Sequence, residues 1–158
     1  MKREYPEHPI IGVGGIVFHN DQVLLIQRGK EPGLGQWSIP GGAVNTGETL
    51  KEAVVREVSE ETHLEVEAVM VAKVLERIFR DPGGRVAYHY VLVDFYCRFK
   101  KGLLVPDSDA QDARFVPLEN LPSYQVATIT LEVIHWVDQL RKNPALFDSL
   151  SHMANLYG

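Results

Sequence analysis

Cysteine is almost missing from this sequence, since Cys97 is the only one among 158 residues. A lone cysteine excludes an internal disulfide framework of the kind that stabilises small secreted domains, and it favours a reducing compartment. Residues 1–9 lack the apolar stretch of a secretory signal peptide, and no hydrophobic run is long enough to span a bilayer. We therefore expect a cytoplasmic protein without a membrane partner.

Positive charge is also scarce, because 16 lysines and arginines stand against 21 aspartates and glutamates, for a formal net charge of −5. A binder of duplex nucleic acid needs a basic face, so we expect no nucleic-acid partner. Small phosphorylated substrates stay possible, because a metal ion can neutralise their charge. Repeats and linkers are missing as well, and 45% hydrophobic content suffices for one core. We predict a single domain over residues 1–158.

Apolar runs bounded by turn residues predict the strands. The run at 85–99 is apolar on both faces, which predicts a central strand covered by helices on both sides. The tail from Asn143 is weakly patterned. The expected strands are residues 10–18, 22–27, 67–80, 85–99 and 113–116, and the expected last helix is about residues 128–141.

The most informative segment is a helix predicted over residues 50–62. Glu57 and Glu61 fall inside its apolar stripe, and Glu60 flanks them at i+3 from Glu57. Dehydrating a carboxylate costs several kcal/mol unless it is paired, and crowding like charges adds repulsion. The stripe itself consists of Leu50, Ala53, Val54 and Val58.

A hard divalent cation would neutralise this cluster, because Mg²⁺ takes oxygen ligands and accepts substrate phosphates in the same shell. Arg56 supplies one nearby positive charge, which is too little for three carboxylates. The alternative is a set of ordinary solvated glutamates on an exposed face. The polar face of this helix is already occupied by Lys51, Glu52, Arg56 and Ser59, which disfavours that alternative.

The segment before the helix also suggests a ligand site. Residues 37–42 form a short apolar strand that ends in a Pro-Gly-Gly turn, where the backbone can pass close to a ligand. Thr49 and Glu52 have the spacing of a capping box, so the helix should begin at about Leu50. Glu48 lies just outside the helix, where it can reach the acidic cluster or support it from behind.

The pattern Gly42-x5-Glu48-x7-Arg56-Glu57-Val58-x-Glu60-Glu61-x-His63-Leu64 resembles the signature box of the Nudix hydrolases at every defined position but one. The resemblance covers residues 42–64, and residues 37–41 before the box are also similar to the family. It implies an α/β class fold, a Nudix-type α/β/α sandwich around a mixed β-sheet. It also implies hydrolysis of a nucleoside diphosphate linked to another group, with Mg²⁺ or with Mn²⁺ as a substitute. A homodimer is possible by the same likeness.

His63 is the departure, because the family usually has glycine there. That glycine follows the helix and typically takes a positive φ, a conformation that histidine tolerates better than most residues. We expect His63→Gly to leave turnover intact and to stabilise the fold by roughly 0.5–1 kcal/mol. A catalytic role for His63 is the alternative.

The resemblance and the helix pattern together assign the site residues. Glu57 and Glu61 are the expected principal metal ligands, with Glu60 as a further ligand, and the Gly41 carbonyl is carried over from the family as another. Glu57 and Glu60 are also expected to be catalytic. The general base stays open, because in Nudix enzymes it lies either within the box or on a later loop.

The loop at residues 106–112 is the obvious source of an acid outside the box. Asp109 is the first choice for a catalytic carboxylate and Asp107 the second, with a plain polar turn as the alternative. For substrate binding we expect Arg28 to contact a phosphate, with a surface role as the alternative. Tyr90 is expected to stack on a nucleoside, although strand aromatics are usually core, and Glu48 completes the predicted substrate-binding set.

The sequence is most similar to family members associated with ADP-ribose, so ADP-ribose or a related nucleotide sugar is the first substrate expected. The second is an oxidised nucleoside triphosphate, hydrolysed in a house-cleaning role. A third hypothesis is a Nudix domain that senses nucleotides without turning them over. Such domains usually lose a box glutamate, and retention of Glu48, Glu57, Glu60 and Glu61 favours an enzyme.

Overall fold

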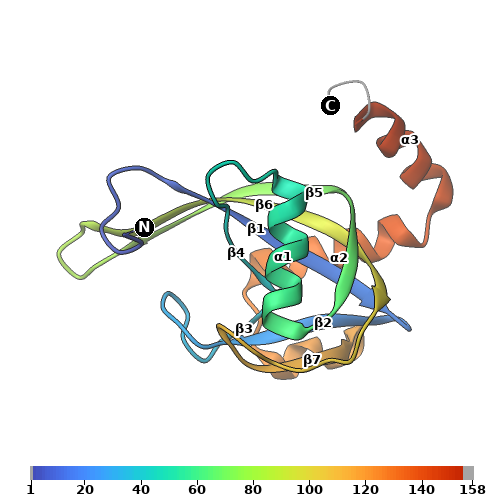
Figure 1. Ribbon diagram of the computed structural model, residues 1–158, viewed down its shortest axis with the longest axis horizontal. Helices are drawn as coiled ribbons and strands as arrows, with labels where there is room; N and C mark the ends of the chain where they lie inside the picture. Colours follow the sequence, from blue (N-terminus) through green and yellow to red (C-terminus); the bar gives the residue numbers. More distant parts are fainter. Residues whose placement is uncertain (1, 155–158) are drawn as a thin grey trace.

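The computed structural model describes residues 2–154, which form a mixed seven-stranded sheet with helices on both faces (Figure 1). Among these residues no helix has the length and apolarity needed to cross a membrane. The strands are β1 (Ile10–His19), β2 (Gln22–Arg28), β3 (Trp37–Ser38), β4 (Gly41–Ala43), β5 (Glu65–Arg80), β6 (Val86–Lys101) and β7 (Ala110–Pro117). The helices are α1 (Leu50–Thr62), the 3-10 helix η1 (Leu118–Tyr124), α2 (Thr128–Arg141) and α3 (Pro144–Ala154).

The strands run in the order β3-β2-β1-β6-β5, with β4 paired to β1 and β7 paired to β2. β1 and β6 are parallel, whereas the other pairs are antiparallel. β1 pairs with β2 only at Phe18 and His19, and its start pairs with β4 over residues 12–14. The sheet is therefore split between the start of β1 and the end of β2, and this split positions the site.

Two hydrophobic clusters fill the two sides of the sheet. Val54 and Val58 of α1 pack on one face with Phe95 of β6. Ile134 of α2 packs on the other face with Tyr96. The predicted α/β/α sandwich is confirmed. The prediction that β6 is a central strand covered on both faces is confirmed for the half of β6 that lies between the helices.

The other half of β6 differs from the prediction. The tip of the β5–β6 hairpin extends beyond the helices (Figure 1), so Tyr88 and Tyr90 are only half-buried. The tail also differs, because residues 144–154 form α3, which the sequence pattern did not indicate. Residues 155–158 of that tail lie outside the described residues.

Both ends of α1 are as predicted. Thr49 Oγ1 accepts a hydrogen bond from the Glu52 backbone N–H, and the Glu52 carboxylate accepts one from the Thr49 N–H, which completes the capping box. His63 ends the helix at φ 60° and ψ 15°, the left-handed conformation expected of it. One member of the predicted stripe was wrong, since Leu50 in the first turn is 36% exposed.

Candidate active site

A cavity of about 870 Å³ lies at the split in the sheet. Strands β1, β2, β4, β5 and β6 contribute to its wall, together with α1, the loop after β2 and the start of α2. Seven of the eight residues predicted for the site line this cavity, and Glu48 does not. The seven are Arg28, Gly41, Glu57, Glu60, Glu61, Tyr90 and Asp109.

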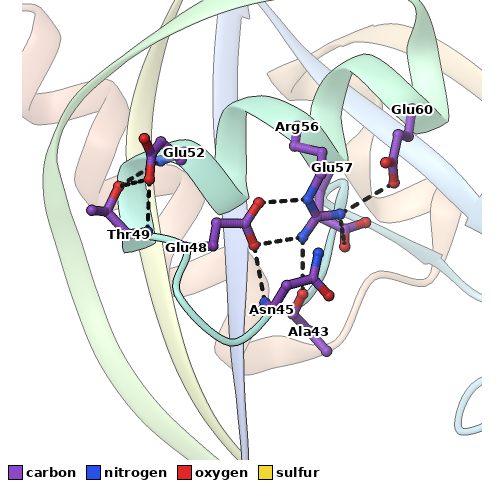
Figure 2. Close-up of polar contacts among 8 residues, drawn as sticks. All are labelled: Ala43, Asn45, Glu48, Thr49, Glu52, Arg56, Glu57 and Glu60. Carbon is purple, nitrogen blue, oxygen red and sulfur yellow. Dashed lines mark hydrogen bonds and ion pairs between the residues drawn. The ribbon is translucent and has the colours of Figure 1, made fainter. Parts of the chain in front are cut away.

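Arg56 organises the acidic wall, as Figure 2 shows, with Glu48 on one side of its guanidinium and two box glutamates on the other. Its Nε and Nη2 donate to the two oxygens of Glu48 at 2.6 and 2.9 Å. Nη2 also donates to the Ala43 carbonyl at 3.1 Å. Nη1 donates to Glu57 Oε1 at 2.7 Å and to Glu60 Oε2 at 3.2 Å. One arginine thus fixes α1 against the loop that precedes it.

Glu48 acts behind this arginine. The hydrogen bonds from Arg56 and the Asn45 backbone N–H lower the pKa of Glu48 from 4.5 to about 2, so it stays ionised. Both of its oxygens are engaged, and it lies outside the cavity wall. This placement favours the supporting role, one of the two that the sequence allowed, over contact with substrate.

Glu61 is the most deeply buried of the box carboxylates. It is 4% exposed, and its Oε2 accepts a hydrogen bond from the Gly41 backbone N–H at 3.0 Å. Burial raises its pKa from 4.5 to about 8, with the charge of Glu57 adding to the effect. Burial also raises the pKa of Glu57, although the hydrogen bond from Arg56 opposes this shift. The predicted inward position of these two carboxylates is therefore seen in the fold.

The chemistry of these side chains fits a hard divalent cation, because Glu57, Glu60 and Glu61 offer carboxylate oxygens on one wall of the cavity. Glu61 is buried, and a bound ion would offset the free-energy cost of dehydrating its charge. Within residues 2–154, however, no three acidic, histidine or cysteine side chains converge closely enough to hold a metal. The reason is local: Arg56 bridges Glu57 and Glu60, and Glu61 is bonded to the Gly41 N–H. Holding an ion requires these carboxylates to exchange partners.

The loop after β6 carries the two aspartates that the sequence singled out. The Asp107 N–H donates to the Glu61 carbonyl at 3.0 Å, and His63 Nε2 lies 2.8 Å from Asp107 Oδ2. These contacts fasten the loop to the end of α1 and leave Asp107 off the cavity wall. Asp109 lines the cavity, where Lys30 Nζ lies 2.5 Å from its Oδ1. The placement favours Asp109 over Asp107.

Arginines and tyrosines line the rest of the cavity. Arg28 donates from Nε to the Pro32 carbonyl at 2.8 Å and lowers the pKa of Glu61 by its charge, against the larger effect of burial. The rings of Tyr88 and Tyr90 are stacked, with centroids 6.4 Å apart and planes 9° from parallel. Tyr90 therefore faces the cavity side by side with Tyr88.

Sequence reasoning missed Arg3, which also lines the cavity. Its segment is held to the β5–β6 hairpin, because the Tyr5 N–H donates to the Ala87 carbonyl at 2.8 Å and the Tyr5 hydroxyl donates to Asp81 at 3.0 Å. The Arg85 guanidinium lies over the Tyr5 ring, 4.6 Å from its centroid. No local pattern signals this contact, because it joins residues about 80 positions apart.

The sandwich, the split sheet and the acid-lined cavity define an α/β/α fold of the kind expected from the box. Residues 8–137 match the NUDIX domain, and the chain belongs to the NUDIX family. An ADP-ribose pyrophosphatase from Methanocaldococcus jannaschii is 39% identical over 115 residues, which are 73% of this chain and 66% of that protein. The human 8-oxo-dGDP phosphatase NUDT18 is 32% identical over 126 residues, or 77% of this chain and 36% of that protein.

A crystal structure of an ADP-ribose pyrophosphatase from Streptococcus suis has a similar fold, with a TM-score of 0.68 at 28% identity. The match covers 87% of this chain and 95% of that one. The chain spans 66% and 36% of the lengths of the two relatives above, less than two thirds of each. The family predicted from the signature box is confirmed by these comparisons.

Proposed function

We propose that this protein is a magnesium-dependent pyrophosphohydrolase that cleaves nucleoside diphosphates linked to another group, with ADP-ribose as the first substrate. The observation that supports this proposal is the division of charge within one cavity. Carboxylates of α1 and Asp109 form one part of the wall, and arginines with a tyrosine pair form another. A diphosphate needs cationic partners, and a nucleoside needs an aromatic surface. The cationic and aromatic residues of the cavity include Arg3, Arg28, Arg77, Arg80, Tyr88 and Tyr90.

Glu57, Glu60 and Glu61 would hold the ion, with the Gly41 carbonyl as a further ligand. The chemistry that magnesium would supply there is withdrawal of charge from the phosphate oxygens and a lower pKa for the attacking water. The roles left to the chain are to bind the diphosphate through arginines and to take a proton from the attacking water. Asp109 is the residue proposed for that proton transfer, with Glu57 or Glu60 within the box as the alternative.

The names of the relatives support both candidate substrates, in the same order. Two of the proteins described above are named ADP-ribose pyrophosphatases, which favours ADP-ribose or a related nucleotide sugar. The human relative is named an 8-oxo-dGDP phosphatase, which keeps oxidised nucleotides as the second candidate. Retention of all four box glutamates favours turnover over nucleotide sensing, because Glu57, Glu60 and Glu61 lie on the cavity wall and Glu48 holds Arg56 behind them.

A panel of nucleoside diphosphate and triphosphate compounds with Mg²⁺ tests the proposal. Release of AMP and ribose 5-phosphate from ADP-ribose is the expected result, and Glu57→Gln should abolish it while the fold survives. A nucleoside monophosphate with pyrophosphate, released from a triphosphate, would select the second candidate. Tight binding without any product would overturn the enzyme proposal in favour of a sensor.

A further inference from the structure

Asp94 is a second buried carboxylate of the cavity, and the chemistry above does not use it. It lies on β6, is 5% exposed and lines the cavity. Asp94 and Tyr96 lie two positions apart on one strand and so point to the same face, and Tyr96 packs in the cluster of α2. Asp94 therefore belongs to the α2 side of the sheet, whereas the box glutamates come from α1 on the other side.

The Asp94 side chain is directed across β1. Gly14 is its register partner on β1, and a side chain at position 14 would overlap with Asp94 Oδ1 and lie 2.7 Å from Ile39 Cδ1. Gly14 thus leaves room for this carboxylate at the cavity wall. Gly12 does the same for the next residue of that face, because a Cβ there would lie 2.8 Å from Leu92 Cδ2.

Nothing within residues 2–154 makes a hydrogen bond or an ion pair with the Asp94 carboxylate. Burial raises its pKa from 3.8 to about 6, and the charges of Arg77 and of Lys73, its register partner on β5, oppose this shift. The Lys73 ammonium lies 3.8 Å from Glu132 instead. Leu75, Leu92 and Ile39 line the cavity with Asp94, and Ile39 lies beside Asp94 at Gly14, so this acceptor has apolar neighbours, although the charged Arg77 lines the cavity too. A carboxylate that faces a cavity without a protein partner can accept hydrogen bonds from a ligand.

We infer that Asp94 selects the substrate by accepting hydrogen bonds from the uncharged nucleoside part, first of all from an exocyclic amino group of the base. This inference rests on the proposed function, because it concerns the same cavity. A carboxylate without a metal ion repels phosphate, so the diphosphate belongs with the arginines and with the carboxylates that would hold the ion. An apolar pocket with one well-placed polar group is the usual means of fixing a base in one orientation. A ribose hydroxyl is also a hydrogen-bond donor, and a 2′-deoxy ligand distinguishes it from the amino group of the base.

Equilibrium binding of ADP and IDP, measured in EDTA by calorimetry, tests this role without turnover. The two ligands differ in the purine amino group, which IDP replaces by a carbonyl. The wild-type protein should bind ADP at least about tenfold more tightly than IDP, since a hydrogen bond to a charged group is lost. Asp94→Asn, which keeps the size of the side chain, should bring the two affinities close together. Asp148→Asn, an exposed control on α3, should leave the ratio unchanged.

A 2′-deoxy analogue of ADP shows whether the hydrogen bond to Asp94 comes from the base amino group or from the ribose 2′-hydroxyl. Loss of affinity for this analogue in the wild type but not in Asp94→Asn would assign the contact to the ribose hydroxyl. An equal ratio of ADP to IDP affinity in wild type and variant, with no effect of the deoxy analogue, would overturn the inference. Failure of the proposed function would appear separately, as absence of product from the wild-type enzyme, while these binding ratios still report on Asp94.

In turnover of ADP-ribose and its inosine analogue, Asp94→Asn should raise KM for ADP-ribose by about tenfold or more and leave kcat near the wild-type value. The inosine analogue should be little affected. An equal loss of kcat with both substrates and unchanged KM would assign Asp94 to the chemistry instead, and would overturn the selective role. Circular dichroism of the variant confirms that the comparison is made on folded protein.

Discussion

Gly42 lies directly against the carboxylate of Glu57. A methyl group at position 42 would be 2.5 Å from the Glu57 carboxyl carbon and 2.5 and 2.6 Å from its two oxygens. Real contacts of a Cβ are longer than this, so the absence of a side chain on β4 sets where Glu57 points. The same carboxylate accepts a hydrogen bond from Arg56 Nη1 at 2.7 Å (Figure 2).

Gly42→Ala should therefore impair activity without unfolding the protein. The added methyl displaces Glu57, and misplacing one catalytic or metal-binding group by about 1 Å costs on the order of 100-fold in rate. We expect kcat/KM to fall by about that factor and magnesium affinity to weaken, as measured by steady-state kinetics and metal titration. Gly83→Ala in the β5–β6 turn is the matched control, since its nearest neighbour is Asp81 Oδ1 at 3.3 Å. Wild-type kinetics in Gly42→Ala would contradict this account.

The acidic helix was predictable because its signals are local. Its start follows from the capping pair Thr49 and Glu52, and its inward carboxylates follow from the 3.6-residue period. Leu50 broke that pattern because the first turn of α1 lies at the edge of the core. The cavity was not predictable, because it depends on where β1 parts from β2. Arg3 and Asp94 reach it only through tertiary contacts with β6 and β1.

Glu61 should make stability depend on pH when no metal is present. Its folded-state pKa of about 8 lies above its ordinary value of 4.5. Protonated Glu61 therefore stabilises the fold fully below the lower value, and this contribution is lost as pH rises through the higher one. The unfolding free energy in EDTA should fall over this range, by at most about 5 kcal/mol from this group. Urea denaturation at pH 5 and pH 9 measures the decline.

Glu61→Gln should reduce that decline, although Glu57 and Asp94, whose pKa values are also raised by burial, retain a part of it. Added Mg²⁺ should stabilise the wild type at high pH, because it binds the ionised form, and should stabilise the variant less. Glu119→Gln on η1 removes one exposed carboxylate as a control. An unchanged slope in Glu61→Gln would contradict the assignment of the buried charge to Glu61.

Asp109 and Asp107 give a direct comparison within one loop. Asp109 lines the cavity beside Lys30, whereas Asp107 is bonded to His63 outside it. If Asp109 takes the proton of the attacking water, Asp109→Asn should lower kcat by about 10²–10⁴ and change KM little. Asp107→Asn should leave kcat near the wild-type value. Equal effects of the two substitutions on kcat would place the general base within the box, at Glu57 or Glu60.

His63→Gly should raise the free energy of unfolding by less than the left-handed backbone conformation at position 63 alone suggests. A residue at φ 60° favours glycine, but this histidine also contacts Asp107 at 2.8 Å, and glycine removes that contact. In an Asp107→Ala background the contact is already absent, and His63→Gly should then raise the unfolding free energy by the full roughly 0.5–1 kcal/mol. Urea denaturation of the four proteins of this cycle measures both quantities.

Turnover should persist in His63→Gly, because backbone hydrogen bonds from Val105 and Asp107 still hold the loop to α1. A large loss of kcat in His63→Gly would instead make this histidine part of the chemistry.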